Sequence, residues 1–352
     1  MCLLQPSAYS LSSLIGVFLM KLSEIGEFGF IERILKKIQG RSGKVLVGPG
    51  DDAAVIKVGD KLVLATSDML VEGSHFDLMF TSAYSLGWKA LAVNISDIAA
   101  MGGVPKYGLV CLGLPSATSL SFADSLFKGM ERMASLFGVS LIGGDTVCSQ
   151  VVTINVTLLG EVEKEQLTLR RGAKVSEKIY VTGPLGEAAC GLLLLKEGKG
   201  RRGRLADKFL KPWPRVKEGE AIGRIASSMI DISDGLSREM HHLCRASKVG
   251  ARLYLEKIPI SMALRRAAKR RSVDPFSFAL HGGEDYELLW TASSSKIGGQ
   301  CPPYKVWEIG EIVPDAEGIK TIDADGKEEE LLPLGYEHFS PEHGVRSMET
   351  SG

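Results

Sequence analysis

The sequence predicts an α/β protein built from two domains, and three observations support this fold class. The chain has 352 residues, compared with roughly 100 to 200 residues for one domain. Short apolar runs typical of strands alternate with longer apolar patterns typical of helices, and each pattern ends at a glycine or aspartate turn. The charged and polar stretch 163–178 separates two such series and is typical of a connection between domains.

The first half of the chain contains most of the strand patterns. Residues 53–58 and 62–65 are joined by a Gly59-Asp60 turn, which predicts two consecutive strands. Residues 85–101 are apolar on most faces and end at two glycines, which predicts a buried helix. Further strands are expected at residues 45–47, 108–114, 140–143 and 151–160, and a second helix at residues 121–137.

The second half repeats the alternation of strands and helices. It opens with a predicted strand over 178–182, followed by a glycine turn and a helix that continues through Leu195. Strands and helices then alternate to about Pro333. We therefore expect an N-terminal domain at 21–162, a C-terminal domain at 175–340 and a tail at 341–352.

The first twenty residues are apolar but make a poor signal peptide. No Lys or Arg precedes Lys21, and no clear small-residue cleavage site follows. An amphipathic helix pattern begins at Met20. We expect translation to begin at Met20 and residues 1–20 to be a non-native or disordered extension, although the sequence leaves a start at Met1 open.

Composition and charge exclude several classes of protein. Lys plus Arg and Asp plus Glu both total 42, which removes the electrostatic basis for bulk binding to nucleic acid or an anionic membrane. The basic runs 201–204 and 265–271 are expected to be solvated faces. No segment reaches the roughly 18 apolar residues of a membrane span. The six cysteines form no C-x-x-C pair, which predicts neither a zinc site nor disulfides and favours a cytoplasmic protein.

Aspartates recur after apolar runs and small residues, which predicts that they gather at strand ends. The segment GPGDDA formally matches a dinucleotide-binding turn, but its two carboxylates would face the pyrophosphate and a strand follows where a helix is needed. Asn94 and Asp97 are three residues apart on the predicted buried helix and share a face. Each aspartate taken alone is more typical of a turn or a helix cap. The set is Asp51, Asp52, Asp68, Asp97, Asp145, Asp231 and Asp234.

A converging set of carboxylates indicates a site for hard cations such as Mg²⁺, because these ions prefer oxygen ligands. Carboxylates that repel anions can bind a polyphosphate only through bridging cations, so ATP is the expected substrate. The chain contains no G-x-x-x-x-G-K-[ST] loop and no protein-kinase motifs. A different nucleotide-binding fold is therefore expected.

The motifs together resemble the thiamine-monophosphate kinase family, within the superfamily of aminoimidazole ribonucleotide synthetase. The resemblance spans about residues 26–339 through GDDAAV, TSDMLVEGSHF, KALAVNISDIAAMGG, LIGGDT, RRGAK, IYVTGPLGEAACGL, MIDISDGL, GGEDYELL and GYEHF. It implies a two-domain fold like that of the synthetase. It also implies transfer of the γ-phosphoryl group of ATP to thiamine monophosphate, assisted by several Mg²⁺ ions, in a cytoplasmic homodimer that pairs its N-terminal sheets.

The resemblance also assigns residues. The implied metal ligands are Asp52, Asp68, Asp97, Asp145, Asp231 and Asp234, with Thr66 and Ser67 as lesser ligands, and Asp97 and Asp145 as the most critical. The implied ATP contacts are Gly144, Asp145, Arg170 and Ser233, with Arg171 as the alternative to Arg170. The implied thiamine contacts are His75, Glu284 and Tyr336. No general base is expected, because the acceptor phosphate is already ionised.

Simpler readings and other functions stand beside this assignment. His75 fits a hydrogen-bonded histidine at a strand end, Glu284 and Asp285 fit turn caps, and Tyr336 fits packing of the tail. Cys148 departs from the family pattern, which has an arginine in this segment, so a phosphate contact there is in doubt. The alternative functions are an ATP-dependent synthetase of the same superfamily and a non-catalytic nucleotide- or thiamine-binding protein.

Overall fold

The structure is a computed structural model, and it describes residues 21–37, 43–199, 203–299 and 304–339. The predictions for 1–20 and 341–352, including the start site, lie outside these residues. The chain divides into a large unit, Ser42–Gly335, and a small unit formed by Met1–Arg41 and Tyr336–Gly352. The described part of the small unit contains one helix, α2 (Leu22–Leu35). No helix among the described residues has the length and apolar character needed to cross a bilayer.

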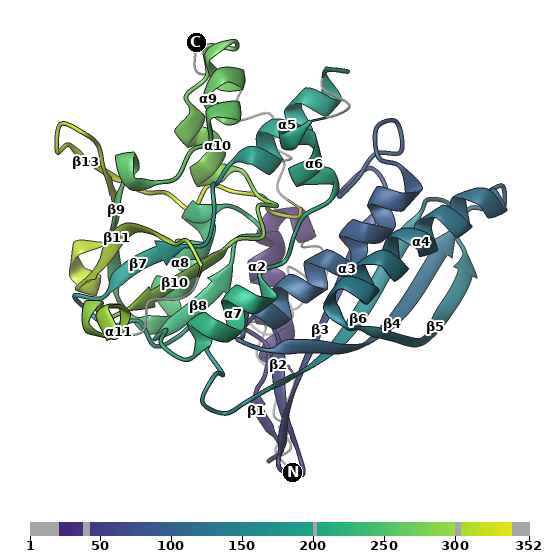
Figure 1. The fold of residues 1–352 in the computed structure, drawn as a ribbon, viewed down its shortest axis with the longest axis horizontal. Coiled ribbons are helices and arrows are strands. Elements are labelled where there is room, and N and C mark those ends of the chain that lie inside the picture. The colour runs from purple at the N-terminus through teal and green to yellow at the C-terminus, as the bar shows by residue number, and fades with distance from the viewer. Residues whose placement is uncertain (1–20, 38–42, 200–202, 300–303, 340–352) are drawn as a thin grey trace, which may run out of the picture. The chain divides into compact units, whose positions relative to one another are not determined.

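The large unit begins with a six-stranded sheet, in the order β1-β2-β3-β6-β4-β5 (Figure 1). All neighbouring strands are antiparallel except β4 and β5, which are parallel. The helices α3 (Ala83–Ala100) and α4 (Leu120–Phe137) cover one face, which we call the inner face. The strands are β1 (Val45–Val47), β2 (Ala54–Val58), β3 (Lys61–Val71), β4 (Val104–Leu114), β5 (Ser140–Cys148) and β6 (Thr153–Val162).

Helices α3 and α4 begin where the sequence supplies caps. Ser82 accepts a hydrogen bond from the backbone N–H of Ser85 at the start of α3, and Ser119 caps α4 in the same way. Leu91, Ile95 and Ile98 of α3 are fully buried in the core of this sheet. Burial of this apolar face is the main stabilisation of the first domain.

A seven-stranded sheet forms the second domain, in the order β13-β12-β9-β11-β7-β10-β8, with β9 and β12 as its parallel pair. The strands are β7 (Lys178–Val181), β8 (Ser228–Asp231), β9 (Gly250–Tyr254), β10 (Leu288–Ala292), β11 (Trp307–Val313), β12 (Ile319–Ile322) and β13 (Glu328–Glu330). The helices are α5 (Glu187–Lys196), α6 (Arg204–Leu210), α7 (Val216–Gly223), α8 (Leu236–Ser247), α9 (Met262–Lys269), α10 (Pro275–His281) and α11 (Ser294–Gly299), with 3-10 turns η1 (Leu255–Lys257) and η2 (Asp315–Glu317).

Helix α3 belongs to the first sheet but also packs on the second domain. It contacts α7 and β8 in addition to β3, β4 and β6. Its residues therefore have neighbours from both domains, which makes α3 the element that connects the two halves of the large unit.

The structure confirms the two-domain α/β fold and corrects one expectation about its acids. The strands predicted over 62–65 and 140–143 are longer than expected, because β3 continues to Val71 and β5 to Cys148. Asp68 and Asp145 therefore lie inside strands, and the prediction that they lie at strand ends was wrong. The reason is that β4 and β6 supply pairing partners along these whole segments, so that small residues continue the ladder instead of turning.

Candidate active site

Three carboxylates from distant segments meet where the two domains pack on each other. Asp52 precedes β2, Asp97 lies on α3, and Asp231 ends β8. One oxygen from each lies within 4.8 Å of the others. We call these three residues the acidic centre. Asp68 of β3 adjoins it, since, in addition to burial, the charge of Asp68 contributes to raising the pKa of both Asp97 and Asp231.

Neighbouring hydroxyl and amide groups orient these carboxylates. Thr66 Oγ1 donates to Asp97 Oδ2 at 2.5 Å. Ser96 Oγ donates to Asp231 Oδ2 at 2.6 Å. Asn94, on the same helix as Asp97, accepts a hydrogen bond from the backbone N–H of Asp68 at 3.1 Å. Asn94 and Asp97, which the sequence predicted to share one face of the helix, therefore both point towards β3.

Burial and mutual repulsion act on the acidic centre together. Burial, followed by the charge of Asp52, raises the pKa of Asp231 to about 8. Burial and the charges of Asp68, Asp231 and Asp52 raise the pKa of Asp97 well above its usual range. The pKa of Asp68 is also raised by burial. Such a cluster is stable in ionised form only if cations neutralise it.

The donor set fits a hard divalent cation. Asp52 Oδ2 is buried and has no hydrogen-bond partner among the described residues. An oxygen in this position would otherwise lose its hydration without compensation. The converging ligands are all carboxylate oxygens, which suits Mg²⁺ rather than a thiolate- or imidazole-binding metal.

Arg170 lies at the edge of the acidic centre. Its guanidinium donates to Asp52 Oδ1 from Nη2 at 2.6 Å and from Nε at 3.1 Å. Its backbone N–H donates to Asp51 Oδ1 at 3.0 Å. Arg171 is exposed. Of the two arginines that the sequence left open, the structure therefore directs Arg170 to the carboxylates.

The loop between β8 and α8 carries Ser233 and Asp234. Glu239 Oε1 accepts from the backbone N–H of Asp234 at 2.9 Å and from Ser233 Oγ at 3.3 Å. The backbone carbonyl of Ser233 accepts from the N–H of Glu284 at 2.7 Å. This contact joins the loop to the GGEDYE segment before β10, so two of the predicted binding motifs are neighbours.

His75 and Glu284, both predicted on the thiamine side, share a contact with a residue that sequence reasoning missed. Lys89 of α3 donates to Glu284 Oε2 at 2.5 Å and lies 3.5 Å from the carbonyl oxygen of His75. His75 Nδ1 accepts from the backbone N–H of Val71 at 3.1 Å, so the expected strand-end hydrogen bond is present. The sequence does contain a signal for Lys89, because this lysine stands between the apolar residues Trp88 and Ala90 of a helix predicted to be buried.

Asp145 is not brought to the acidic centre. Across the first sheet it aligns with Cys111 of β4, Asn155 of β6 and Met69 of β3. Asp68 is adjacent to Met69 in β3 and therefore faces the opposite, inner side. Asp145 lies on the uncovered outer face, in a hollow of about 270 Å³ that also contains Met69, Cys111, Val147 and Asn155.

The remaining predicted positions are divided between this outer face and the small unit. The Ser67 hydroxyl lies on the outer face, 3.0 Å from Thr157 Oγ1. Gly144 precedes Asp145 in β5, and a Cβ atom there would lie 1.7 Å from the carbonyl oxygen of Val110. Tyr336 belongs to the small unit, where its ring packs edge-on against His338 at 4.8 Å. Cys148 ends β5 as an exposed thiol.

Sequence reasoning also missed a buried ionic network in the second domain. Glu287 is fully buried and accepts from Lys208 at 2.6 Å and from Arg215 at 2.7 Å. Asp285 accepts from the backbone N–H of Gly186 at 2.6 Å, so it caps α5 rather than the turn that the sequence suggested. Asp285 and Glu287 are alternate residues of GGEDYE, and their contacts hold in place the segment that carries Glu284.

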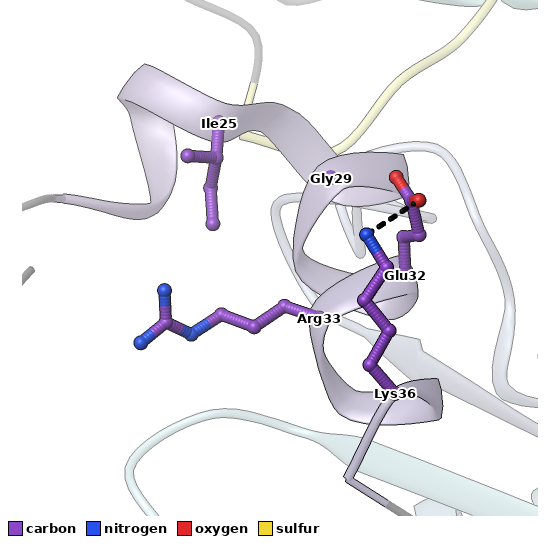
Figure 2. Close-up of a pocket in the computed structure, with 5 residues that line it drawn as sticks. All are labelled: Ile25, Gly29, Glu32, Arg33 and Lys36. Carbon is purple, nitrogen blue, oxygen red and sulfur yellow. Dashed lines mark ion pairs between the residues drawn. The ribbon is translucent and has the colours of Figure 1, made fainter.

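A separate depression lies along α2 in the small unit (Figure 2). Its lining in the described chain is Ile25, Gly29, Glu32, Arg33 and Lys36. Glu32 and Lys36 form an ion pair across one helical turn at 2.9 Å. This lining includes no predicted site residue, so the depression is not a candidate for the same chemistry.

Comparison with known proteins places these features in a family context. The chain matches the AIR synthase related protein N-terminal domain over residues 50–162 and the corresponding C-terminal domain over residues 174–322. It is 35% identical to thiamine-monophosphate kinase of Aquifex aeolicus (strain VF5) over 324 residues, which cover 91% of this chain and 100% of the relative. It is 36% identical to thiamine-monophosphate kinase of Escherichia coli (strain K12) over 335 residues, covering 90% and 98%.

A solved structure shows the same likeness in three dimensions. The structure described as AaThiL complexed with AMPPCP and TMP superposes with a TM-score of 0.82 at 34% identity. The match covers 91% of this chain and 99% of that chain. Sequence and structure therefore agree over nearly the whole length.

Proposed function

Since the chain belongs to the thiamine-monophosphate kinase family, we propose that it transfers the γ-phosphoryl group of ATP to the phosphate of thiamine monophosphate, giving thiamine diphosphate and ADP. The observation that carries this proposal is the acidic centre. Its carboxylates come from both domains and lie beside Arg170, as binding of a polyphosphate requires. The acceptor phosphate oxygen is already ionised near neutral pH, so the reaction needs alignment and charge neutralisation rather than a general base.

We assign the cation site to the acidic centre together with Asp68. Asp52, Asp68, Asp97 and Asp231 would hold Mg²⁺, with Thr66 orienting Asp97. Bound Mg²⁺ supplies neutralisation of the phosphate oxygens as the two anions approach. Arg170 would contact the ATP phosphates, and Ser233 and Asp234 would form the adjoining part of the nucleotide site. Their loop is fixed for this role by Glu239.

The thiamine side is assigned to His75, Glu284 and Tyr336. A carboxylate suits the cationic thiazolium ring, and an aromatic ring suits the flat pyrimidine. The contact of Lys89 with both Glu284 and the His75 carbonyl supports a common binding region for the first two. Tyr336 is assigned by its motif alone.

We also propose a homodimer that uses the outer face of the first sheet. Met69, Leu109 and Val147 are 54%, 39% and 56% exposed, which is unusual for apolar residues on a central sheet. A second copy covering this face would also cover Asp145 and Gly144. Their roles in binding metal and ATP would then belong to the assembled dimer.

Light scattering on the purified protein tests the dimer. Leu109→Asp should give a monomer, because the new carboxylate would be buried between two sheets. Met262→Asp is the matched control, since Met262 is an exposed methionine on α9 of the second domain. A monomeric wild-type protein at working concentration would contradict the proposed dimer.

Exposed thiols at Cys111 and Cys148 support the proposed cytoplasmic location.

The kinase proposal is tested by incubating purified protein with ATP, Mg²⁺ and thiamine monophosphate and measuring thiamine diphosphate by chromatography. Asp97→Asn should lower kcat by about a hundredfold or more, because it removes a central charge of the cation site. Asp60→Asn, in an exposed turn, is the control. Folded wild-type protein that forms no thiamine diphosphate would refute the proposal. ADP formed without thiamine diphosphate would favour a synthetase.

A further inference from the structure

Lys89 is a buried cation with three partners from three different segments. Its side chain is 1% exposed. The ammonium group lies 2.5 Å from Glu284 Oε2, 3.5 Å from the carbonyl oxygen of His75 and 3.8 Å from the ring centroid of Phe209 in α6. These contacts join helix α3 to the turn after β3 and to the segment before β10.

We propose that Lys89 is a positioning residue for recognition of the acceptor, which fixes the Glu284 carboxylate against the cationic part of thiamine monophosphate. This inference rests on the proposed function, since it assigns Glu284 to the thiamine side. It goes further by naming a residue that never touches the substrate and yet determines how well the acceptor binds.

A role in stability alone does not account for a lysine at this position. The neighbouring α3 residues Leu86, Ala90 and Val93 are buried and apolar. A buried ammonium group loses its hydration, and an apolar residue of similar size often gives equal or greater stability than a buried ion pair. Burial lowers the pKa of Lys89 and the Glu284 carboxylate opposes this. The charge therefore has a use other than filling the core.

The backbone around Glu284 is held in a fixed and uncommon conformation. Glu284 has φ of +67°, a left-handed value that few non-glycine residues adopt. Its N–H donates to Ser233, and the N–H of Tyr286 donates to Ile232 at 2.8 Å. Strain of this kind is typical of functional segments. The backbone thus directs the Glu284 side chain, and Lys89 fixes its carboxylate.

The side chains of Lys89 and Glu284 differ in solvent exposure, and this difference indicates different roles. The Glu284 side chain is 24% exposed, whereas that of Lys89 is 1% exposed. Phe209 covers the ammonium group on another side. Lys89 bonds to one carboxylate oxygen, Oε2, which leaves Oε1 for the proposed contact with the acceptor. Lys89 therefore acts on the acceptor only through Glu284.

The position of Lys89 along α3 predicts which substrate it affects. Asp97 lies eight residues further along the same helix, which corresponds to about 12 Å of axial rise. The acidic centre is thus separated from the Lys89–Glu284 pair. Loss of Lys89 should weaken binding of the acceptor and leave binding of ATP nearly unchanged.

Steady-state kinetics with each substrate varied in turn test this inference on the full-length protein. Lys89→Met should raise the KM for thiamine monophosphate about ten- to a hundredfold and change the KM for ATP less than about twofold. Lys89→Arg should restore part of the loss, because it keeps the charge. In a double-mutant cycle, Lys89→Met should add little to Glu284→Gln, since both remove the same interaction.

A matched control separates positioning from stability. Lys178 of β7 is a half-buried lysine that is also in an ion pair, with Glu311 of β11 at 2.8 Å. Lys178→Met should lower the thermal midpoint without a selective change in the acceptor KM. If Lys89→Met does not fold, Lys89→Gln carries the same test, because it removes the charge of the ion pair and keeps a polar group in the buried position.

The outcomes distinguish the inference from the function on which it rests. Equal increases in both KM values, additive effects with Glu284→Gln, or a loss of stability alone would each overturn the role of Lys89. Wild-type protein without thiamine-phosphate kinase activity would overturn the proposed function, and this inference with it. A selective increase in the acceptor KM with partial rescue by Lys89→Arg supports the inference.

Discussion

Replacing Asp231 with asparagine should make the metal-free protein more stable while it removes a ligand of the proposed cation site. Asp231 is buried beside Asp52 and Asp97, with ligand oxygens within 4.8 Å. Asparagine has nearly the same shape and still accepts the hydrogen bond from Ser96. The substitution therefore removes a repelling carboxyl group with little change in packing.

The expected gain follows from the pKa of Asp231, which burial and the charge of Asp52 raise from 3.8 to about 8. Near pH 7, folding requires this group to take up a proton that it lacks in the unfolded chain. The pH exceeds the unfolded pKa by about 3, and each pH unit is worth about 1.4 kcal/mol, which gives about 4 kcal/mol. Allowing for relaxation of the neighbouring acids, we expect a gain of about 2 to 4 kcal/mol.

The sign of the pH dependence is fixed by the same values. The folded-state pKa is higher than the unfolded one, so the folded protein binds the proton more tightly. The contribution of Asp231 to the free energy of unfolding of the wild-type protein therefore falls as the pH rises from about 4 to about 8. The advantage of Asp231→Asn should be small near about pH 4 and largest near about pH 8.

Urea unfolding in the presence of a chelator measures this effect at several pH values for wild-type protein, Asp231→Asn and the surface control Asp60→Asn. Addition of Mg²⁺ should then stabilise the wild-type protein more than Asp231→Asn, because the variant has lost a ligand. A variant that is less stable than wild type at about pH 8 without metal would refute the electrostatic reasoning. A gain that does not depend on pH would also refute it.

Three other predictions follow from packing and burial. Gly144→Ala should destabilise the protein by about 3 kcal/mol or more in urea unfolding, because the added Cβ would lie 1.7 Å from a backbone oxygen of Val110; Gly43→Ala, in open space, is its control. Glu287→Gln should cost about 2 to 3 kcal/mol, since it removes the buried carboxylate charge that pairs with the half-buried Lys208 and Arg215, and an unchanged thermal midpoint would contradict this. Mass spectrometry after thiol labelling should show Cys244 unmodified in folded protein, because burial raises its pKa to about 12.

The sequence was most informative where one local pattern determined the structure. The apolar pattern of 85–101 predicted α3, and the three-residue spacing of Asn94 and Asp97 placed both on its buried face. The motif match then identified Asp52 and Asp231 as partners, and the structure brings them together with Asp97. The fold class followed from the alternation of strands and helices.

The sequence was least informative where a one-residue difference changes the face of a strand. Asp68 and Asp145 follow similar motifs, but the pairing of β5 with β4 places Asp145 on the outer face, whereas Asp68 faces α3. Side chains alternate along a strand, so only the register across the sheet decides this. Lys89 and Glu284 are 195 residues apart in the chain, so their contact also depended on the tertiary structure.

The proposed acceptor-side residue Lys89 and the proposed cation ligand Asp97 lie on one helix, so α3 fixes the spacing between the two proposed binding regions. Insertion or deletion of a single residue between Lys89 and Asp97 would turn one end by about 100° relative to the other. Either Asp97 or Lys89 would then point away from its site. This segment should therefore tolerate many substitutions at apolar positions but no change in length.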